Sequence, residues 1–144
     1  MTTVAPNDPI VFGQSSLTAK LGSGTAIEFA DAVQQAVLTT PTAWADWNPI
    51  SGKSLSKPVP SLNSCQLTLA QDLTEGSLFQ WLEANQRKRA TFVLTPDDSV
   101  MAAVEFEAYI GRPGTFGGPA GSTATSTAEL RLIGEPVYTW APAV

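Results

Sequence analysis

The fold is decided by the stretch Leu62–Asp98, which reads LNSCQLTLAQDLTEGSLFQWLEANQRKRATFVLTPDD. Its pattern predicts a strand, a short turn, one helix, a second strand over Ala90–Thr95 and a tight turn at Pro96–Ser99. The first strand alternates polar residues with the apolar residues Cys65, Leu67 and Leu69. A lone helix packed on strands gives the fold a skeleton but supplies no chemistry.

The helix is predicted over about residues 74–88, and its start admits two interpretations. Thr74 as N-cap would place Leu73 against Leu78 as a hydrophobic staple, whereas Asp72 as N-cap would pair with Glu75 in a box-like arrangement. The staple favours Thr74. The apolar stripe of the helix is expected to consist of Leu78, Phe79 and Leu82, with Trp81 at its edge.

Composition limits the function classes. A chain of 144 residues that is 43% hydrophobic can build one domain with its own core. Cys65 is the single cysteine, so no disulfide can form within the chain, and its place on an apolar strand face predicts a buried thiol. The chain has no histidine, which removes Ser-His-Asp and Cys-His catalysis and histidine zinc sites. We therefore predict no enzyme, no cofactor and no metal site.

Charge and hydropathy point to a protein that folds in a reducing cytoplasm. The formal net charge is −5, which disfavours wrapping nucleic acid through its phosphates. The first residues lack the basic start and apolar core of a signal peptide, and no apolar run is long enough to span a bilayer. No membrane anchor is expected.

The chain is expected to form an N-terminal arm over residues 1–9, one domain over 10–140 and a tail over 141–144. Alternation predicts strands in the first part of the domain at 10–22, 25–29 and 33–40. Helical propensity also permits a helix over 26–38, but the valines and the Thr-Thr-Pro ending favour a strand.

Residues 41–61 are predicted to be a long loop, because they contain four prolines and show no clear period. Trp44 and Trp47 within it suggest docking onto an apolar surface, and Lys53 and Lys57 are its basic residues.

The second half of the domain carries the clearest strand, Val100–Ile110, followed by a glycine-rich segment and a strand at Ala124–Gly134 that Pro136–Trp140 can continue. Strands of this number with a single helix predict a mainly β fold, an antiparallel β-sandwich or open barrel flanked by one α-helix.

Charged residues offer little chemistry. Glu105 and Glu107 share one strand face at roughly 7 Å between Cα atoms. A solvated face is the simplest interpretation, because an acid–base pair needs a cleft and a split in pKa. The glycines of residues 111–123 lack the lysine and helix of a phosphate loop. Arg87, Lys88 and Arg89 suit the negative end of the helix dipole without any ligand.

With these motifs in order, the chain resembles the tail tube (major tail) protein of long-tailed bacteriophages in its short single-domain form. The likeness covers roughly residues 25–136 and lies in the order and spacing of several short motifs. They are Glu28-Phe29, the VLTTP of residues 37–41, the CQLTL strand at 65–69, the acidic turn at Asp72, FQWL at 79–82, ATFVLTP at 90–96 and Gly134-Glu135-Pro136.

The resemblance implies hexameric rings that stack into a hollow tube, whose inner wall is a continuous β-barrel built from strands of all subunits. The implied partners are further copies of the chain and the tape-measure, tail terminator and tail-tip proteins. Genome DNA would pass through the lumen without specific binding. The implied location is the virion tail, assembled in the host bacterial cytoplasm, and the family has no catalytic residues to carry over.

On this resemblance we expect three surfaces to serve assembly. The lumen-facing residues would be Glu105 and Glu107, because an acidic wall lets DNA slide. The loop that contacts the next ring would use Trp44, Trp47, Lys53 and Lys57, and the two arms are candidates for the same contact. The residues that meet an acidic surface of a neighbouring subunit would be Arg87, Lys88 and Arg89.

Other functions also fit the sequence. The chain could be another ring-forming tail component such as a tail terminator, or a secretion-tube subunit. It could also be a carbohydrate-binding β-sandwich that uses Trp44 and Trp47.

Overall fold

A computed structural model describes residues 12, 15–97 and 101–142, and this part of the chain contains ten strands and one α-helix. The predicted arm at 1–9, the end of the turn at Pro96–Ser99 and the last two residues of the tail lie outside it. The elements are β1 (Ser16–Lys20), β2 (Ile27–Glu28), a 3-10 turn (Ala30–Ala32), β3 (Val33–Thr39), β4 (Ala43–Trp47), β5 (Leu55–Val59), β6 (Ser64–Ala70), α1 (Leu78–Ala84), β7 (Arg89–Thr95), β8 (Ala103–Tyr109), β9 (Thr125–Leu132) and β10 (Val137–Thr139).

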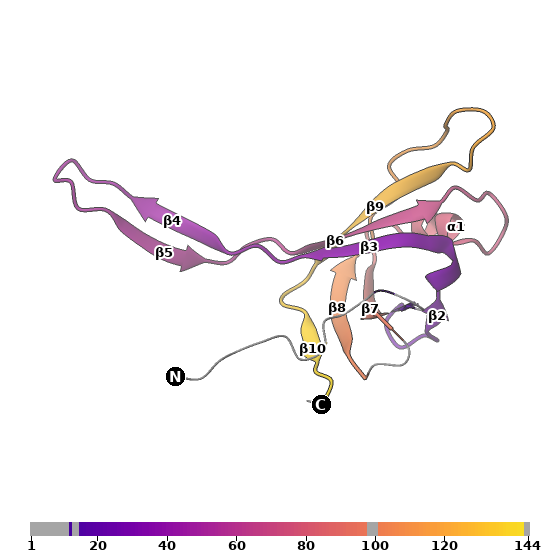
Figure 1. The fold of residues 1–144 in the computed structure, drawn as a ribbon, viewed down its shortest axis with the longest axis horizontal. Coiled ribbons are helices and arrows are strands. Elements are labelled where there is room, and N and C mark those ends of the chain that lie inside the picture. The colour runs from indigo at the N-terminus through magenta and orange to yellow at the C-terminus, as the bar shows by residue number, and fades with distance from the viewer. Residues whose placement is uncertain (1–11, 13–14, 98–100, 143–144) are drawn as a thin grey trace.

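The fold is mainly β and antiparallel, as predicted. The principal sheet has the order β2-β1-β7-β8-β9-β6-β3, with β10 paired to β8 beside this path. β8 meets β9 at only two residue pairs, Ala108↔Leu132 and Tyr109↔Arg131, so the sheet can bend there. Figure 1 shows β3, β6 and β9 running across β7 and β8. The two halves of the sheet therefore pack as a nearly orthogonal sandwich.

One core lies between the two halves. It collects alternate residues of β1, β6, β7, β8 and β9, together with Leu78 and Leu82 of α1. Phe92 stacks on Phe106 with centroids 5.5 Å apart, and Trp81 meets Phe92 edge-on at 6.5 Å. The expected burial of Cys65, Leu67 and Leu69 is confirmed. Period-two patterning is what places these side chains on one face of the sheet.

The helix is shorter than predicted, and the Thr74 N-cap is wrong. Ser77 is the N-cap, and its hydroxyl accepts a hydrogen bond from the Gln80 N–H. Thr74 instead donates its N–H to the Asp72 carboxylate, and its hydrogen bonds lower the pKa of Asp72. Leu73 is 72% exposed, so the staple does not form. A turn stabilised by Asp72 thus replaces the first helical turn.

The basic run does not close the helix, contrary to the prediction. Asn85 is the C-cap, and its side-chain amide donates to the Trp81 carbonyl oxygen. Arg87 has a φ of 69°, a left-handed conformation that ends any helical continuation. Its N–H donates to the Ile110 carbonyl oxygen, and Arg89 already belongs to β7.

The predicted loop at 41–61 is also wrong in its centre, because β4 and β5 form a hairpin there. Pro58 lies within β5 opposite Trp44. Both strands of a two-stranded ribbon are edge strands. A proline is therefore tolerated at positions where no partner strand needs a backbone N–H donor. This is why proline content did not exclude a strand.

The remaining strand predictions need smaller changes. The choice of strand over helix for residues 33–40 is confirmed by β3, which pairs with β6. Residues 136–140 do not continue β9, since β10 turns back to pair with β8. Gly111 follows β8 at a close approach, where a Cβ would lie 2.0 Å from the Glu129 carbonyl oxygen. Only glycine fits there.

Leu82→Ala should lower the free energy of unfolding by about 2–5 kcal/mol, because Leu82 is fully buried and truncation leaves a cavity. Urea unfolding followed by tryptophan fluorescence measures the loss. Leu73→Ala is the matched control and should change stability by less than about 0.5 kcal/mol. Equal losses in both variants would contradict the assignment of α1 to the core.

Candidate assembly surface

The β4–β5 hairpin, residues 43–59, is here named the ribbon. It pairs from Ala43↔Val59 to Trp47↔Leu55 and belongs to no larger sheet. Figure 1 shows it projecting from the body of the molecule as an extension of β3 and β6. Ser56 donates a hydrogen bond to Asp46 across it. A two-stranded hairpin without further strands is only marginally stable in water.

Each face of the ribbon carries apolar side chains. Side chains of a strand alternate, so Trp47, Leu55 and Val59 lie on one face and Trp44 and Pro58 on the other. Trp44 is 60% and Trp47 65% exposed. The two indoles cannot form one stacking platform for a sugar, because they point to opposite sides. Both faces instead suit protein surfaces.

The tip of the ribbon, residues 48–54, carries an apolar residue that the sequence analysis missed. The Gly52 N–H donates to the Pro49 carbonyl oxygen at 3.1 Å, and Gly52 takes a φ of 85°. Ile50 stands at the corner of this turn and is fully exposed. The sequence does contain a signal for this exposed residue, since an isoleucine lies between Pro49 and Ser51 where turns usually carry polar residues, glycine or proline. Lys53 is also exposed at the tip, and Lys57 lies on β5 beside Trp47.

The outward face of β7, β8 and β9 is mainly polar and holds the predicted lumen residues. Glu105 is exposed on β8, and the half-buried Glu107 accepts from Arg89 of β7 at 2.6 Å. Arg131 and Glu129 form a second pair on β9 at 3.0 Å. Much of the charge on this face is therefore compensated, and Glu105 has no ion-pair partner among the described residues.

The predicted basic contact surface separates into individual roles. Arg89 is held by Glu107, and the Lys88 ammonium donates to the Asn85 side-chain oxygen at 3.4 Å. The Arg87 side chain makes no ion pair within residues 15–97 and 101–142. The three cations thus do not form one cluster.

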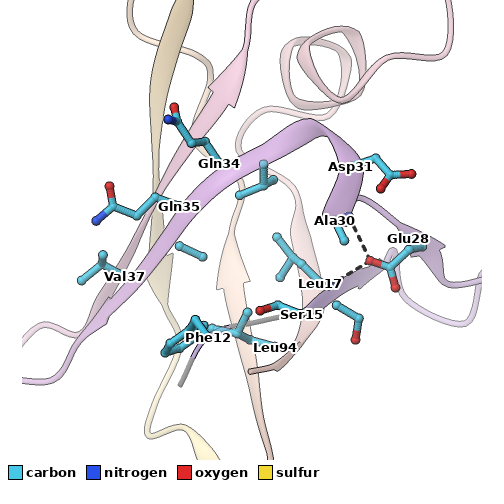
Figure 2. A pocket seen from close by; sticks show the side chains of 13 residues that line it. Phe12, Ser15, Leu17, Glu28, Ala30, Asp31, Gln34, Gln35, Val37 and Leu94 are labelled. Atoms are coloured by element: carbon cyan, nitrogen blue, oxygen red, sulfur yellow. Dashed lines mark hydrogen bonds between the residues drawn. The ribbon is translucent and has the colours of Figure 1, made fainter. Parts of the chain in front are cut away.

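A cavity of about 960 Å³ opens at the seam where the two ends of the principal sheet approach each other. Figure 2 shows Phe12, Leu17 and Leu94 on one side of β3 and the side chain of Val37 on its other side, with Glu28 and Asp31 near Leu17. The Glu28 carboxylate accepts from the Leu17 and Ala30 N–H groups, both at 2.9 Å. We name this space the seam cavity; its remaining lining residues include Ser16, Ala30, Val33, Gln34, Gln35 and Ala36.

Within the described ranges, no helix is long and apolar enough to cross a membrane.

No protein-family model and no curated protein matches the sequence. Solved structures match its fold. A chain of the PVC sheath/tube terminator in the extended state, from an extracellular contractile injection system, is 15% identical with a TM-score of 0.55, covering 94% of this chain and all 100% of that one. A chain of the anti-feeding prophage cap, the AFP tube terminating cap, is 14% identical with a TM-score of 0.55 over 97% of both chains.

A third likeness is to a chain of the anti-feeding prophage baseplate, with 12% identity and a TM-score of 0.57 over 96% of this chain and 97% of that one. At such identities the likeness establishes the fold alone. The single-helix, mainly β architecture of this chain is thus one found in components of contractile injection particles.

Cys65 should resist thiol reagents in the folded protein, because burial raises the pKa of its thiol to about 12. At pH 8 the thiolate fraction is then roughly a thousandfold below that of a free cysteine. Labelling by a chromogenic disulfide reagent, with and without 6 M guanidinium chloride, measures the ratio of the labelling rates of Cys65 in the unfolded and folded protein. Equal rates in the two conditions would show that Cys65 is accessible.

Proposed function

We propose that this chain is a non-catalytic structural subunit of a phage tail or tail-like particle, forming hexameric rings that stack into a hollow tube. It would be assembled in the bacterial cytoplasm and reside in the tail. The single observation that carries the proposal is the ribbon, a projecting two-stranded hairpin that exposes a tryptophan on each face. The fold likeness to components of contractile injection particles supports it.

The ribbon favours assembly over a solitary domain. None of its residues belongs to the buried core, so the domain gains little from ordering it. Covering Trp44 and Trp47, which face opposite ways, requires contacts on both faces. In a stack of rings, a projecting ribbon can meet one neighbour within its own ring and another in the next ring. Burial between subunits then supplies the stabilisation that the hairpin lacks alone.

The sheet edges favour the same conclusion. β3 ends the principal sheet and has no strand partner on its outer side among the described residues. It is seven residues long, and such an edge invites pairing with another chain. A closed ring whose strands join into a common barrel removes these edges, and this is the arrangement we propose for the tube wall.

Within this proposal the polar face that carries Glu105 lines the lumen. Threonines and compensated ion pairs dominate the part of that face formed by β7, β8 and β9, so few cations are free to hold phosphates. The partners would be the tape-measure protein inside the tube, the terminator at one end and the tip proteins at the other. DNA would pass without specific binding.

A tail terminator is the second candidate, and one finding favours it. Two of the structural neighbours are described as terminator or cap proteins, and each covers nearly the whole chain. One of them comes from an extracellular contractile injection system, so the likeness does not single out the tail tube of long-tailed phages. Negative-stain microscopy of purified protein separates the candidates, because a tube subunit stacks and a terminator stops at one ring.

Replacing residues 43–59 by Asn-Gly should abolish ring and tube formation while leaving a folded monomer. The ribbon makes no core contacts, so the free energy of unfolding should change by less than about 1 kcal/mol. Light scattering and negative-stain microscopy measure assembly, and urea unfolding measures stability. Trp44→Ala and Trp47→Ala should each weaken assembly, because each removes the anchor of one face.

Normal tubes from the shortened chain would refute the role of the ribbon. The proposed function itself would fail if the unaltered protein stayed monomeric at high concentration with no rings visible, even when tail-tip proteins were supplied to initiate assembly.

Glu105→Lys should leave tubes intact but make them retain short duplex DNA, because it places an unpaired cation on the proposed lumen wall. Co-sedimentation of labelled DNA with tubes at low and moderate salt gives the measurement. Glu75→Lys, on the exposed turn before α1, makes the same charge change elsewhere. Equal retention by the two variants would contradict the lumen assignment of Glu105.

A further inference from the structure

We propose that the seam cavity of one copy receives the ribbon tip of a second copy, with Ile50 as the apolar plug and Lys53 paired to Asp31. This inference rests on the proposed function and names the surface that the ribbon meets. It assigns a use to two features that the domain alone leaves unexplained, an open cavity beside the core and an exposed isoleucine at a turn corner.

The cavity has apolar walls, to which Phe12 contributes together with Leu17 and Leu94. Leu17 and Leu94 are core residues whose surfaces reach it, and Val37, which also lines it from the outward face of β3, is 42% exposed. The cavity volume of about 960 Å³ lies within the range of about 300–1,000 Å³ that is typical of ligand-binding pockets. A turn of a few residues fits such a space.

The tip cannot fill the cavity of its own molecule. In Figure 1 the ribbon extends away from the domain, and the cavity lies within the domain between β1 and β3. The hydrogen-bonded turn of Pro49 and Gly52 presents Ile50 outward at the far end. An exposed isoleucine held on a defined turn is preorganised for insertion, which limits the entropy lost on binding.

Charge selects the same pair of surfaces. The charged residues that line the cavity are Glu28 and Asp31, both acidic. Glu28 is occupied by two backbone N–H groups, whereas Asp31 is exposed and points away from the wall in Figure 2. The only charged residue of the tip, residues 48–54, is Lys53. An apolar plug with one cation therefore meets an apolar socket with one available carboxylate.

A contact of this kind is heterologous, because tip and socket are different surfaces of one chain. Each copy gives its tip to one neighbour and receives a tip from another. Such a contact closes into a ring when the rotation between copies permits, and otherwise grows as a filament. It thus supplies a bond for ring closure or for stacking.

Mixing two single-cysteine variants tests the contact. Protein carrying Ile50→Cys is mixed with protein carrying Val37→Cys, assembled, and treated with a short bismaleimide. Cys65 is buried, so the introduced thiols are the reactive ones. Covalent dimers should appear in the mixture and be at least about fivefold fewer when Thr127→Cys, on β9 and outside the cavity lining, replaces Val37→Cys.

Three outcomes would overturn the inference in different ways. Rings that form without Ile50–Val37 cross-links refute the socket but leave the proposed function standing. Absence of any ring refutes both. A Thr3→Cys/Val37→Cys chain that cross-links within one molecule in assembled rings would instead assign the cavity to the chain's own N-terminal residues.

Charge reversal tests the polar part. Lys53→Glu on the tip-bearing copy should lower the cross-linking yield about fivefold at low salt, the scale of one partly exposed ion pair. Asp31→Lys on the socket-bearing copy should restore it. A yield that Lys53→Glu does not reduce would overturn the pairing of Lys53 with Asp31.

Discussion

The structure depends on the packing of two halves of one antiparallel sheet across a single core. β8 and β9 touch at only two residue pairs, which lets the halves cross and enclose the aromatic cluster around Phe92. Helix α1 closes this core with Leu78 and Leu82. Each of the core-forming strands packs one face against the core, so its other face can be polar. This alternation produces the outward surface with Glu105 and the Arg89–Glu107 pair.

Folding and the proposed assembly use separate parts of the chain. The core is complete without the ribbon, whereas the ribbon has apolar side chains on both faces and no core of its own. Its order in an assembly would come from surfaces contributed by other copies, so binding would carry the cost of fixing it. In the proposed assembly, this separation would let a folded subunit accumulate before it polymerises.

Sequence patterning predicted the strands that border the core, because burying one face imposes a period of two. β6, β7 and β9 and the buried Cys65 follow from that pattern. The ribbon escaped prediction for the converse reason: with apolar side chains on both faces there is no alternation to detect. The ends of α1 were not predicted either, because several residues near each end could act as a cap. The structure uses Ser77 and Asn85, and the left-handed Arg87 follows them.

The sequence by itself determined the mainly β class, the single helix, the core residues and the exclusion of histidine chemistry, since these depend on composition and on neighbours a few residues apart. Only the tertiary structure decided that Glu107 is neutralised by Arg89, that Trp44 and Trp47 face opposite ways, and that Leu17 and Val37 share a cavity. These relations join residues that are distant in the chain or depend on strand register. They are set by how the sheet bends and pairs, which no local pattern encodes.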